Sequence, residues 1–317
     1  MPEAAFVRDF DKYNLILAGA AGAGELRQLG DGRAGYLADV AKSSGVNADF
    51  TTDGCVAIKK TSGVKILDGG RVYWDHSANE ATYKPANDRD FYAGTAQGDA
   101  ESGDGFVFVN LNRLQSNVLD INNSPWVDAV VGTQALGGFL PARRRGSSHN
   151  LQMSATNEAQ KVDILTRDGF ATGANAIAEL IFNVISDGAG TVVDVSLGLA
   201  NATHATDADS ITESIFIHLN ANSTTIYAES DDGTTEVAAT DTTITYTEGT
   251  PVEAWFDMRD PADVQIYING ALILGSTVFG VGAAVGPWKL LAHVEKTSST
   301  DAYELDVNRL TARLMEQ

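Results

Sequence analysis

The chain has 317 residues, of which 44% are hydrophobic, so it can build a folded core and is not an intrinsically disordered protein. Its length suits about two domains. The formal net charge of −20 argues against direct binding to nucleic acid, because phosphate groups repel an acidic surface. The same charge suits a soluble protein, or one that associates with a basic surface or with cations.

The chain shows few targeting or redox features. The N-terminal segment 1–14 has acidic residues and no basic region, so we do not expect a signal peptide. The longest apolar run, 15–24, is too short to cross a membrane. The single cysteine, Cys55, allows no disulfide within the chain, which fits folding in a reducing cytoplasm. Cys55 lies in an alternating stretch, and we predict that its side chain is buried.

The first hundred residues predict short strands and little helix. Runs rich in Val, Ile, Thr, Phe and Tyr, separated by Gly, Asp and Asn, are typical of β-structure. The clearest runs lie at 56–60, 71–75, 81–85 and 105–112. In the last run Phe106 and Phe108 fall on one face and Val107 and Val109 on the other. We therefore expect both faces to be covered, as in a small closed barrel or an interface.

A glycine-rich stretch near the N-terminus has the residue spacing of a dinucleotide-binding loop. Gly30, Gly32 and Gly35 have the spacing G-x-G-x-x-G, and Asp53 follows about twenty residues later. Such a loop could place backbone N–H groups against a pyrophosphate. However, no hydrophobic strand leads into Gly30, and the later chain lacks the alternating strands and helices of a parallel sheet. We interpret the glycines as turns in a β-domain, with dinucleotide binding as the alternative.

The composition changes at about residue 113. Residues 113–149 are rich in loop-forming residues, including Pro125 and Pro141, and contain the basic run 143–145. We predict a connecting segment here, between a first domain at 1–112 and a second at 150–317. The basic run is either solvated or locally paired surface, or a docking site for an acidic partner.

Beyond residue 150 the predicted strands become longer and more regular. About ten strands separated by turn signals predict an antiparallel two-sheet sandwich of the jelly-roll type. Asn269 and Gly270 supply the positive φ angles of a type I′ turn, so residues 264–274 should form a tight hairpin. The predicted fold class is all-β, with a small barrel-like N-terminal domain followed by a larger jelly-roll sandwich.

Catalytic patterns are sparse. The sequence has no G-x-S-x-G motif, and its five histidines have no zinc-type spacing. His218 and His293 lie within strand patterns, where we expect partly buried, hydrogen-bonded side chains. Glu179 and Glu253 lie in apolar strands and are the best candidates for the carboxylate pair of a glycosidase. The alternative, which we favour, is that both glutamates are structural and form ion pairs.

Two further groups of residues were considered as ligand sites. The acidic turns at 207–209 and 231–232 offer oxygen ligands but lack the EF-hand spacing, so we expect ordinary turns and leave Ca²⁺ binding open. Trp288 follows a Gly-Pro turn and could form a sugar-binding platform at the rim of the sandwich. For Trp288 we favour a structural position in the core over this platform.

The N-terminal domain carries a recognisable pattern. A G-x-V-Y-W-D strand and turn is followed by a G-x-A-x-x-D motif and a closing V-x-V-x-L strand. The matching residues are Gly70, Val72, Tyr73, Trp74 and Asp75, then Gly94, Ala96, Asp99, Ala100, Gly103 and Asp104, and finally Val107, Val109 and Leu111. On these residues, the region 12–112 resembles a family of small bacteriophage capsid decoration (cement) proteins. The second half looks like the concanavalin-like jelly rolls of some phage head proteins.

This resemblance implies a structural virion protein and not an enzyme. The N-terminal domain would bind the outer surface of the major capsid protein lattice, as a homotrimer, and stabilise the head after assembly in the host cytoplasm. The jelly roll would project outward, where it could contact cell-surface glycans. No catalytic residue, cofactor, nucleic acid or membrane is implied.

The resemblance also directs attention to interface residues. The candidates are Phe6, Phe10 and Tyr13 in an N-terminal arm, and Tyr73, Trp74, Asp75 and Asp104 in the domain itself. For Trp74 and Asp75 we favour a structural role, with Trp74 packed under a hairpin and Asp75 accepting backbone N–H bonds at its turn, and an interface is the alternative. A rival function is a lectin-like or glycan-cleaving protein with an N-terminal targeting module, in which Trp288 would contact the glycan.

Overall fold

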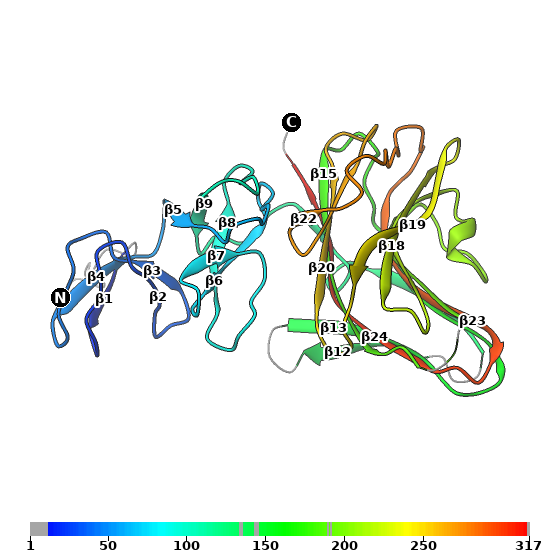
Figure 1. Ribbon diagram of the computed structural model, residues 1–317, viewed down its shortest axis with the longest axis horizontal. Coiled ribbons are helices and arrows are strands. Elements are labelled where there is room, and N and C mark those ends of the chain that lie inside the picture. Colours follow the sequence, from blue (N-terminus) through cyan, green and yellow to red (C-terminus); the bar gives the residue numbers. More distant parts are fainter. Residues whose placement is uncertain (1–11, 133–135, 143–145, 189, 191, 316–317) are drawn as a thin grey trace, which may run out of the picture. The chain divides into compact units, whose positions relative to one another are not determined.

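The structure is a computed structural model, and it describes residues 12–132, 136–142, 146–188, 190 and 192–315 (Figure 1). The chain divides into two compact units, Met1–Gln115 (unit 1) and Ser116–Gln317 (unit 2). In the described residues the regular elements are β-strands, apart from one 3₁₀ turn, η1 (Ala208–Ser210). The predicted all-β class is therefore confirmed. None of the helical structure in these ranges has the length and hydropathy of a membrane span.

Unit 1 contains two small antiparallel sheets (Figure 1). The first has the order β1-β4-β3-β2, with β1 (Lys12–Ile16), β2 (Leu26–Gln28), β3 (Ala34–Tyr36) and β4 (Asn47–Thr51). The second has the order β5-β9-β8-β6-β7, with β5 (Cys55–Lys59), β6 (Arg71–Asp75), β7 (Glu80–Thr82), β8 (Phe91–Ala96) and β9 (Phe106–Leu111). The strand predicted at 71–75 is confirmed as β6.

The side chain of Asn112 joins the two sheets of unit 1. Asn112 follows β9 directly and has a φ of 56°, a conformation that asparagine adopts more readily than most residues. Its Oδ1 accepts a hydrogen bond from the backbone N–H of Ala34 (2.8 Å), and its Nδ2 donates to the carbonyl oxygens of Ala34 (2.9 Å) and Thr52 (2.7 Å). One amide at the end of the second sheet thus satisfies three backbone groups in or next to the strands of the first sheet.

Strand β9 is covered on one face only. Val107 and Val109 are fully buried, whereas Phe106 and Phe108 are 59% and 58% exposed. A closed barrel that covers both faces of this strand is therefore wrong, since successive side chains point to opposite faces and only the valine face meets the core. The other alternative, that an interface covers the phenylalanine face, stays a prediction. Cys55, on the neighbouring strand β5, is also exposed. Its predicted burial is wrong because the alternation of β5 turns Ile58 to the core instead.

The β6–β7 hairpin confirms the predicted role of Asp75 at the turn. Its Oδ1 accepts hydrogen bonds from the backbone N–H groups of Ser77 (2.7 Å) and Ala78 (3.0 Å). The bond from the Ser77 hydroxyl and those from these amides lower the pKa of Asp75. Trp74 is half-buried and lies opposite Ala81.

We expect Asp75→Ala to lower the free energy of unfolding of unit 1 by about 1–2 kcal/mol, because two turn amides lose a charged acceptor. Urea unfolding followed by circular dichroism measures this loss. Asp53→Ala is the control, since the ion pair of Asp53 with the exposed Arg113 is long, at 3.5 Å, and should contribute little. Equal stability of Asp75→Ala and the parent protein would contradict the assigned role of the carboxylate.

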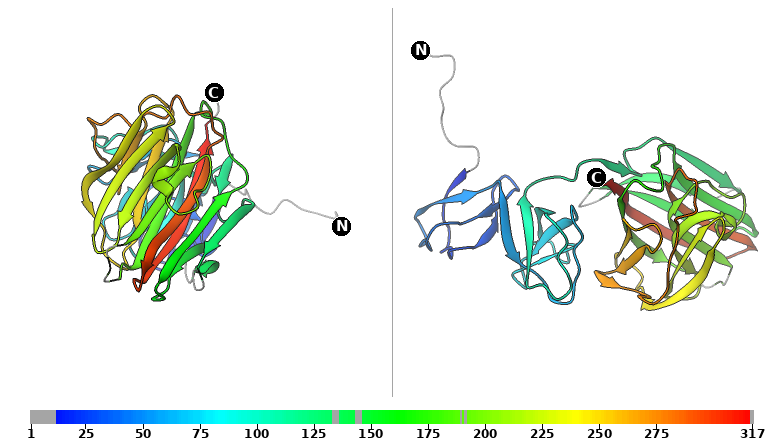
Figure 2. Two further views of the ribbon diagram at one scale, coloured as in Figure 1. Left: turned by 90° about the vertical axis from the view of Figure 1, so that its right-hand side faces the viewer. Right: turned by 90° about the horizontal axis from the view of Figure 1, so that it is seen from above.

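Unit 2 is a sandwich of two antiparallel sheets (Figure 2). The eight-stranded sheet follows the path β12-β13-β24-β15-β20-β21-β22, with β10 also paired to β24. Its strands are β10 (Val118–Asp120), β12 (Leu136–Ala142), β13 (Gly146–Met153), β15 (Ala176–Ser186), β20 (Val252–Met258), β21 (Gln265–Ile268), β22 (Ala271–Leu272) and β24 (Tyr303–Leu314). The predicted antiparallel two-sheet sandwich is confirmed.

The seven-stranded sheet of unit 2 has the order β11-β14-β23-β16-β17-β18-β19. Its strands are β11 (Trp126–Val131), β14 (Glu158–Thr166), β16 (Val193–Ala200), β17 (Glu213–Asn220), β18 (Thr225–Asp232), β19 (Glu236–Thr245) and β23 (Lys289–Ser299). Aliphatic side chains of both sheets form one core between them, for example Leu197 of β16 and Leu180 of β15. The face of the seven-stranded sheet turned away from this core is called the outer face below.

The predicted connecting segment 113–149 differs from the observed structure. Strands β10 and β11 lie within it and pair with β24 and β14, so much of this segment is part of the sandwich. Pro125 lies between β10 and β11, whereas Gly137, Gly138 and Pro141 lie within β12, at the edge of its sheet, where proline is tolerated. This is why the composition of the segment resembles that of a linker. The basic run 143–145 lies outside the described residues. The hairpin predicted at 264–274 is confirmed, with φ angles of 50° at Asn269 and 77° at Gly270.

Candidate functional site on the outer face of unit 2

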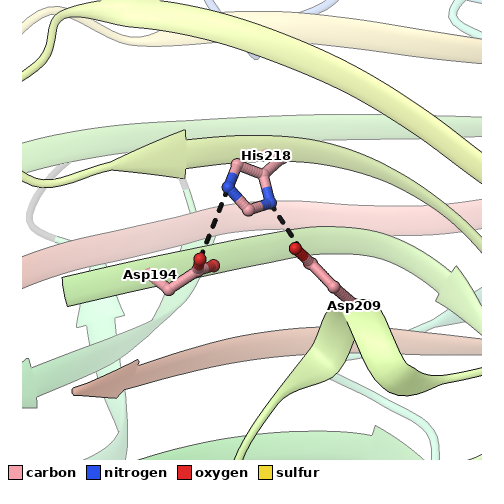
Figure 3. A group of neighbouring side chains, drawn as sticks. All are labelled: Asp194, Asp209 and His218. Atoms are coloured by element: carbon pink, nitrogen blue, oxygen red, sulfur yellow. Dashed lines mark ion pairs between the residues drawn. The ribbon is translucent and has the colours of Figure 1, made fainter. Parts of the chain in front are cut away.

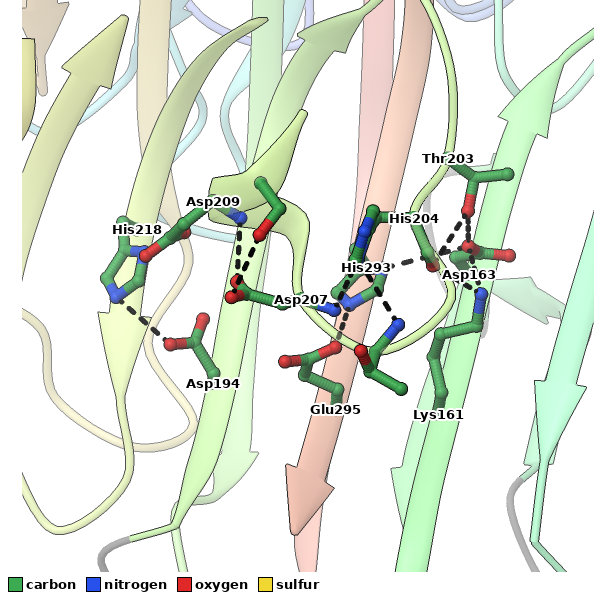
Figure 4. A network of polar contacts seen from close by, with 12 residues as sticks. Lys161, Asp163, Asp194, Thr203, His204, Asp207, Asp209, His218, His293 and Glu295 are labelled. Carbon is green, nitrogen blue, oxygen red and sulfur yellow. Dashed lines mark hydrogen bonds and ion pairs between the residues drawn. The ribbon is translucent and has the colours of Figure 1, made fainter. Parts of the chain in front are cut away.

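A row of polar side chains crosses the outer face of the seven-stranded sheet (Figure 4). Neighbouring strands place these residues directly opposite one another, in the order Asp163, His293, Ser196, His218 and Tyr227. The same strands turn aliphatic side chains into the core at alternate positions, so their polar residues share the outer face. The row brings together residues that are up to 130 positions apart in the sequence.

The segment 201–212 connects β16 to β17 and lies over part of this row. Its Ala208 and Ile211 pack against an apolar cluster on the outer face that includes Phe216 and Leu291. Polar contacts hold the segment as well, since Lys161 Nζ donates to the carbonyl oxygen of His204 (2.7 Å). Apolar packing and hydrogen bonds together fix this loop on the sheet.

One end of the row centres on His293, which is fully buried. Its Nε2 lies 2.9 Å from Glu295 Oε2, and its Nδ1 lies 3.6 Å from Asp163 Oδ2. Burial alone would lower the pKa of His293, but the two flanking carboxylates raise it. Burial alone would raise the pKa of Asp163, but His293, Thr203 and Lys161 lower it. This end therefore holds a compensated group of opposite charges.

The other end of the row centres on His218, which is flanked by three carboxylates. Figure 3 shows two of them, Asp194 and Asp209. Its Nε2 lies 3.5 Å from Asp194 Oδ2, and its Nδ1 lies 3.4 Å from Asp209 Oδ1 and 3.5 Å from Glu229 Oε1. Burial raises the pKa of Asp194 to about 7, despite the nearby imidazole. Burial alone would lower the pKa of His218, but its three acidic neighbours raise it to about 11. Negative charge therefore exceeds positive charge at this end.

Several polar atoms on this face are buried and make no hydrogen bond in the part of the chain that the structure describes. They are Asp163 Oδ1, Ser196 Oγ, His218 Nδ1, Glu229 Oε1 and His293 Nδ1. A buried polar atom without a partner costs about 1–3 kcal/mol, so native proteins usually satisfy such atoms with water or an ion. The arrangement can hold water or a cation, and it can exchange protons.

Trp288 does not form the sugar-binding platform considered from the sequence. Its side chain is fully buried, and its Nε1 donates a hydrogen bond to Thr172 Oγ1 (3.0 Å). The backbone of Trp288 pairs with that of Phe170 in both directions, which turns the indole ring into the core. The glycan-contact hypothesis for Trp288 is therefore wrong, because a buried ring presents no face to a ligand.

Glu179 and Glu253 do not form an accessible carboxylate pair. Both side chains are buried. Glu179 forms ion pairs with Arg313 (2.8 Å) and Arg309 (3.4 Å). The favoured interpretation, a paired structural charge, is confirmed for Glu179, and neither carboxylate is placed to reach a polysaccharide.

The acidic turns considered for Ca²⁺ mostly bind backbone amides. Asp231 Oδ1 accepts from the N–H of Gly233 (2.8 Å). Asp232 accepts from Thr234 (3.0 Å) and Thr235 (2.8 Å), and also from Ala283 of a distant loop (3.2 Å). The hydrogen bond from the Thr234 hydroxyl, together with these amides, lowers the pKa of Asp232 to about 2. These turns are ordered by their own hydrogen bonds.

We expect Asp232→Ala to destabilise unit 2 in a pH-dependent way. Because the pKa of Asp232 is lowered from 3.8 to about 2 in the folded state, its stabilising contribution is full above about pH 4 and disappears as the pH falls through about 2. The variant should lose about 1–2 kcal/mol at neutral pH and much less at pH 2. Denaturant unfolding of both proteins from pH 7 to pH 2 measures this. A difference that stays constant over that range would contradict the assignment, and the exposed Glu236→Gln is the control.

The interface candidates of unit 1 lie in different environments. Tyr13 is half-buried and packs against the core of the first sheet. Tyr73 is half-buried and forms an edge-on contact with Tyr92, with ring centroids 5.6 Å apart. Asp104 is exposed and accepts a hydrogen bond from the N–H of Glu101 (2.7 Å). Phe6 and Phe10 lie outside the described residues. An interface role for these residues stays a prediction.

The glycine motif at 30–35 does not form a nucleotide loop. It lies at the turn between β2 and β3 and at the start of β3, and no helix follows it. The polar row on unit 2 was missed by sequence analysis, although the burial of His218 and His293 was predicted correctly. The available signal was a polar residue at every second position of otherwise apolar strands, as at Asp194 and Ser196.

Comparison with known proteins finds a family match within the first unit. Residues 11–111 match the model of a phage cement protein family. The match is confined to the N-terminal region of the chain. The resemblance based on its strand and turn motifs is thereby confirmed for that region. No curated protein sequence matches the chain.

Solved structures show only distant similarity to this chain. The carbohydrate recognition domain of Emp47p is 13% identical, with 63% of this chain and 96% of that chain covered and a TM-score of 0.43. A structure from work on endo-acting O-glycanases of the human gut microbiota is 11% identical, with coverage of 63% and 98% and a TM-score of 0.42. The carbohydrate esterase vb_24B_21 from Shiga toxin-encoding bacteriophage phi24B is 11% identical, with coverage of 62% and 93% and a TM-score of 0.38. Similarity of this degree does not indicate a function for this chain.

Proposed function

We propose that this protein decorates the outside of a phage capsid as a structural, non-enzymatic component of the virion. Unit 1 binds the outer surface of the major capsid protein lattice, as a homotrimer, and unit 2 projects from the particle. The observation that carries the proposal is the family match at 11–111, which covers nearly all of unit 1. Many copies on one shell convert a modest contact per chain into a large total stabilisation.

The distribution of charge supports this division of roles. Unit 1 contains 16 acidic and 12 basic residues, whereas unit 2 contains 26 acidic and 10 basic residues. A strongly acidic unit is repelled by its own copies and by other acidic surfaces, which keeps it in solvent. A nearly balanced unit meets a smaller electrostatic cost when it docks on a protein lattice.

The exposed aromatic face of β9 supports unit 1 as the docking unit. Phe106 and Phe108 point to the same side of the strand and are both more than half exposed. Ala57 lies opposite Phe108 on β5 and is also exposed. Exposed aromatic side chains are enriched at protein interfaces, because they bury a large area at a small cost in side-chain entropy.

The proposal is tested by adding the purified full-length protein to bare, expanded capsids. We expect saturable co-sedimentation and a higher temperature of capsid disruption. The double variant Phe106→Ser/Phe108→Ser should lose most of this binding. The control Val278→Ser/Val285→Ser removes two exposed apolar side chains from unit 2 and should bind like the parent protein. A parent protein that fails to bind the capsids would overturn the proposal.

Contact of unit 2 with cell-surface glycans is a second candidate. The observation that favours it is the polar row, where the half-buried Tyr227 ring lies edge-on to His218 and partly exposed carboxylates can accept hydrogen bonds from hydroxyl groups. A glycan array with the full-length protein tests this. Saturable binding that Tyr227→Ala abolishes would support glycan contact, and no binding to any glycan would remove it.

A further inference from the structure

We propose that His218, Asp209 and Glu229 of unit 2 form a binding site for one divalent metal ion of the zinc class. The ligand atoms are His218 Nδ1, Asp209 Oδ1 and Glu229 Oε1. They come from strand β17, the 201–212 loop and strand β18. The site is separate from the capsid contact proposed for unit 1.

The distances from His218 Nδ1 to the two carboxylate oxygens fit a shared metal better than hydrogen-bonded ion pairs. His218 Nδ1 lies 3.4 Å from Asp209 Oδ1 and 3.5 Å from Glu229 Oε1. A charge-assisted hydrogen bond would bring nitrogen and oxygen to about 2.7–2.9 Å. Ligand atoms at about 2.0–2.2 Å from a tetrahedral zinc ion lie roughly 3.3–3.6 Å from one another. Both observed distances fall in the second range.

The burial of two of these atoms is an independent indication of a ligand. His218 is 3% exposed and Glu229 is 7% exposed. Neither His218 Nδ1 nor Glu229 Oε1 makes a hydrogen bond within the described residues. Because a buried polar atom without a partner is costly, these two atoms, which lie 3.5 Å apart, indicate a group that satisfies both.

The second nitrogen of the His218 ring has the environment typical of a metal-bound histidine. Its Nε2 lies 3.3 Å from Asn220 Oδ1 and 3.5 Å from Asp194 Oδ2. An N–H on Nε2 donates to these oxygens, and the metal takes the place of a proton on Nδ1. A carboxylate on the far side of a ligating histidine fixes the orientation of its ring. Asp194 is therefore a positioning residue for this site (Figure 3).

The set of donors selects the class of ion. One imidazole nitrogen with two carboxylates suits Zn²⁺ and related transition ions, whereas Ca²⁺ and Mg²⁺ prefer sites made of oxygen alone. The Asp209 side chain is 44% exposed, so an ion can enter from solvent and keep water as a further ligand. A bound ion would tie the 201–212 loop to the sheet beneath it.

The test is a titration of chelator-treated, full-length protein with Zn²⁺ by calorimetry. Co²⁺ absorption provides a second readout, because four-coordinate Co²⁺ absorbs strongly in the visible range. We expect one ion per chain, with affinity lowered at least about tenfold in Asp209→Asn and about 10- to 100-fold in Asp194→Asn. His218→Gln should abolish binding. Asp209 lies in a partly exposed loop, so its variant stays informative even if His218→Gln does not fold.

The control is Asp168→Asn, which removes an exposed carboxylate of unit 2 away from the cluster. It should bind Zn²⁺ like the parent protein. Any of three results would overturn the proposal. These are no saturable Zn²⁺ binding, equal Zn²⁺ affinity in Asp209→Asn and the parent protein, or binding of Ca²⁺ without binding of Zn²⁺.

Discussion

Trp288→Ala should lower the free energy of unfolding of unit 2 by about 3–5 kcal/mol. Trp288 is among the largest fully buried side chains of the protein and belongs to the core between the two sheets. The substitution leaves a cavity and removes the donor that bonds to Thr172. Denaturant unfolding followed by near-ultraviolet circular dichroism measures the loss.

Val285→Ala is the matched control for this prediction. Val285 lies three residues earlier and is strongly exposed, so its truncation should change stability by less than about 0.5 kcal/mol. Unchanged stability of Trp288→Ala, together with a loss of glycan binding, would contradict the core position and restore the platform hypothesis.

Gly94→Ala should unfold unit 1 and leave unit 2 folded. Gly94 lies in β8 with a φ of 153°, and a Cβ atom there would lie 2.0 Å from the carbonyl oxygen of Asn110 in β9. Because the atom in the way belongs to the backbone of a paired strand, no side-chain rotation relieves the clash. The strands must separate, which should cost about 3 kcal/mol or more.

Scanning calorimetry can separate the two units in this experiment. Gly94→Ala should lose or shift the transition of unit 1 and should no longer bind capsids, while the transition of unit 2 stays in place. Gly103→Ala is the control, since Gly103 has no positive φ and a Cβ there meets nothing within 4 Å. A Gly94→Ala protein with an unchanged transition of unit 1 would contradict the close approach of β8 and β9.

Features that depend on local geometry were predictable from the sequence. The run at 71–75 is rich in strand-forming residues and ends in Asp75, which can close a turn. Both the strand and the turn appear in the structure. The Asn269-Gly270 pair adopts the two positive φ angles that its hairpin requires. In each case the controlling interaction lies within a few residues along the chain.

Features that depend on distant pairing were not predictable. Strands β2 and β3 have three residues each, which is too short for an alternation to be recognised. Strand β10 pairs with β24, almost two hundred residues later, so its membership of the sandwich leaves no local signal. The alternation around Cys55 was recognised, but a sequence pattern does not say which face of an edge strand meets the core.

The candidate site on unit 2 depends partly on local sequence, which was predictable, and partly on the pairing of distant strands, which was not. Alternation within β17 and β23 correctly predicted that His218 and His293 are buried. Their neighbours follow from strand register, which places Asp163 opposite His293, and from a loop that returns over the sheet with Asp209. The cluster therefore becomes visible only once the sheet order is known.

The most direct test of the docking of unit 1 on the capsid is a cryo-EM map of particles decorated with the full-length protein. We expect density for the two sheets of unit 1 in contact with the outer surface of the capsid lattice, with density for unit 2 farther from the shell. Density that places unit 2 against the lattice with unit 1 free, or a particle exterior without this chain, would contradict it.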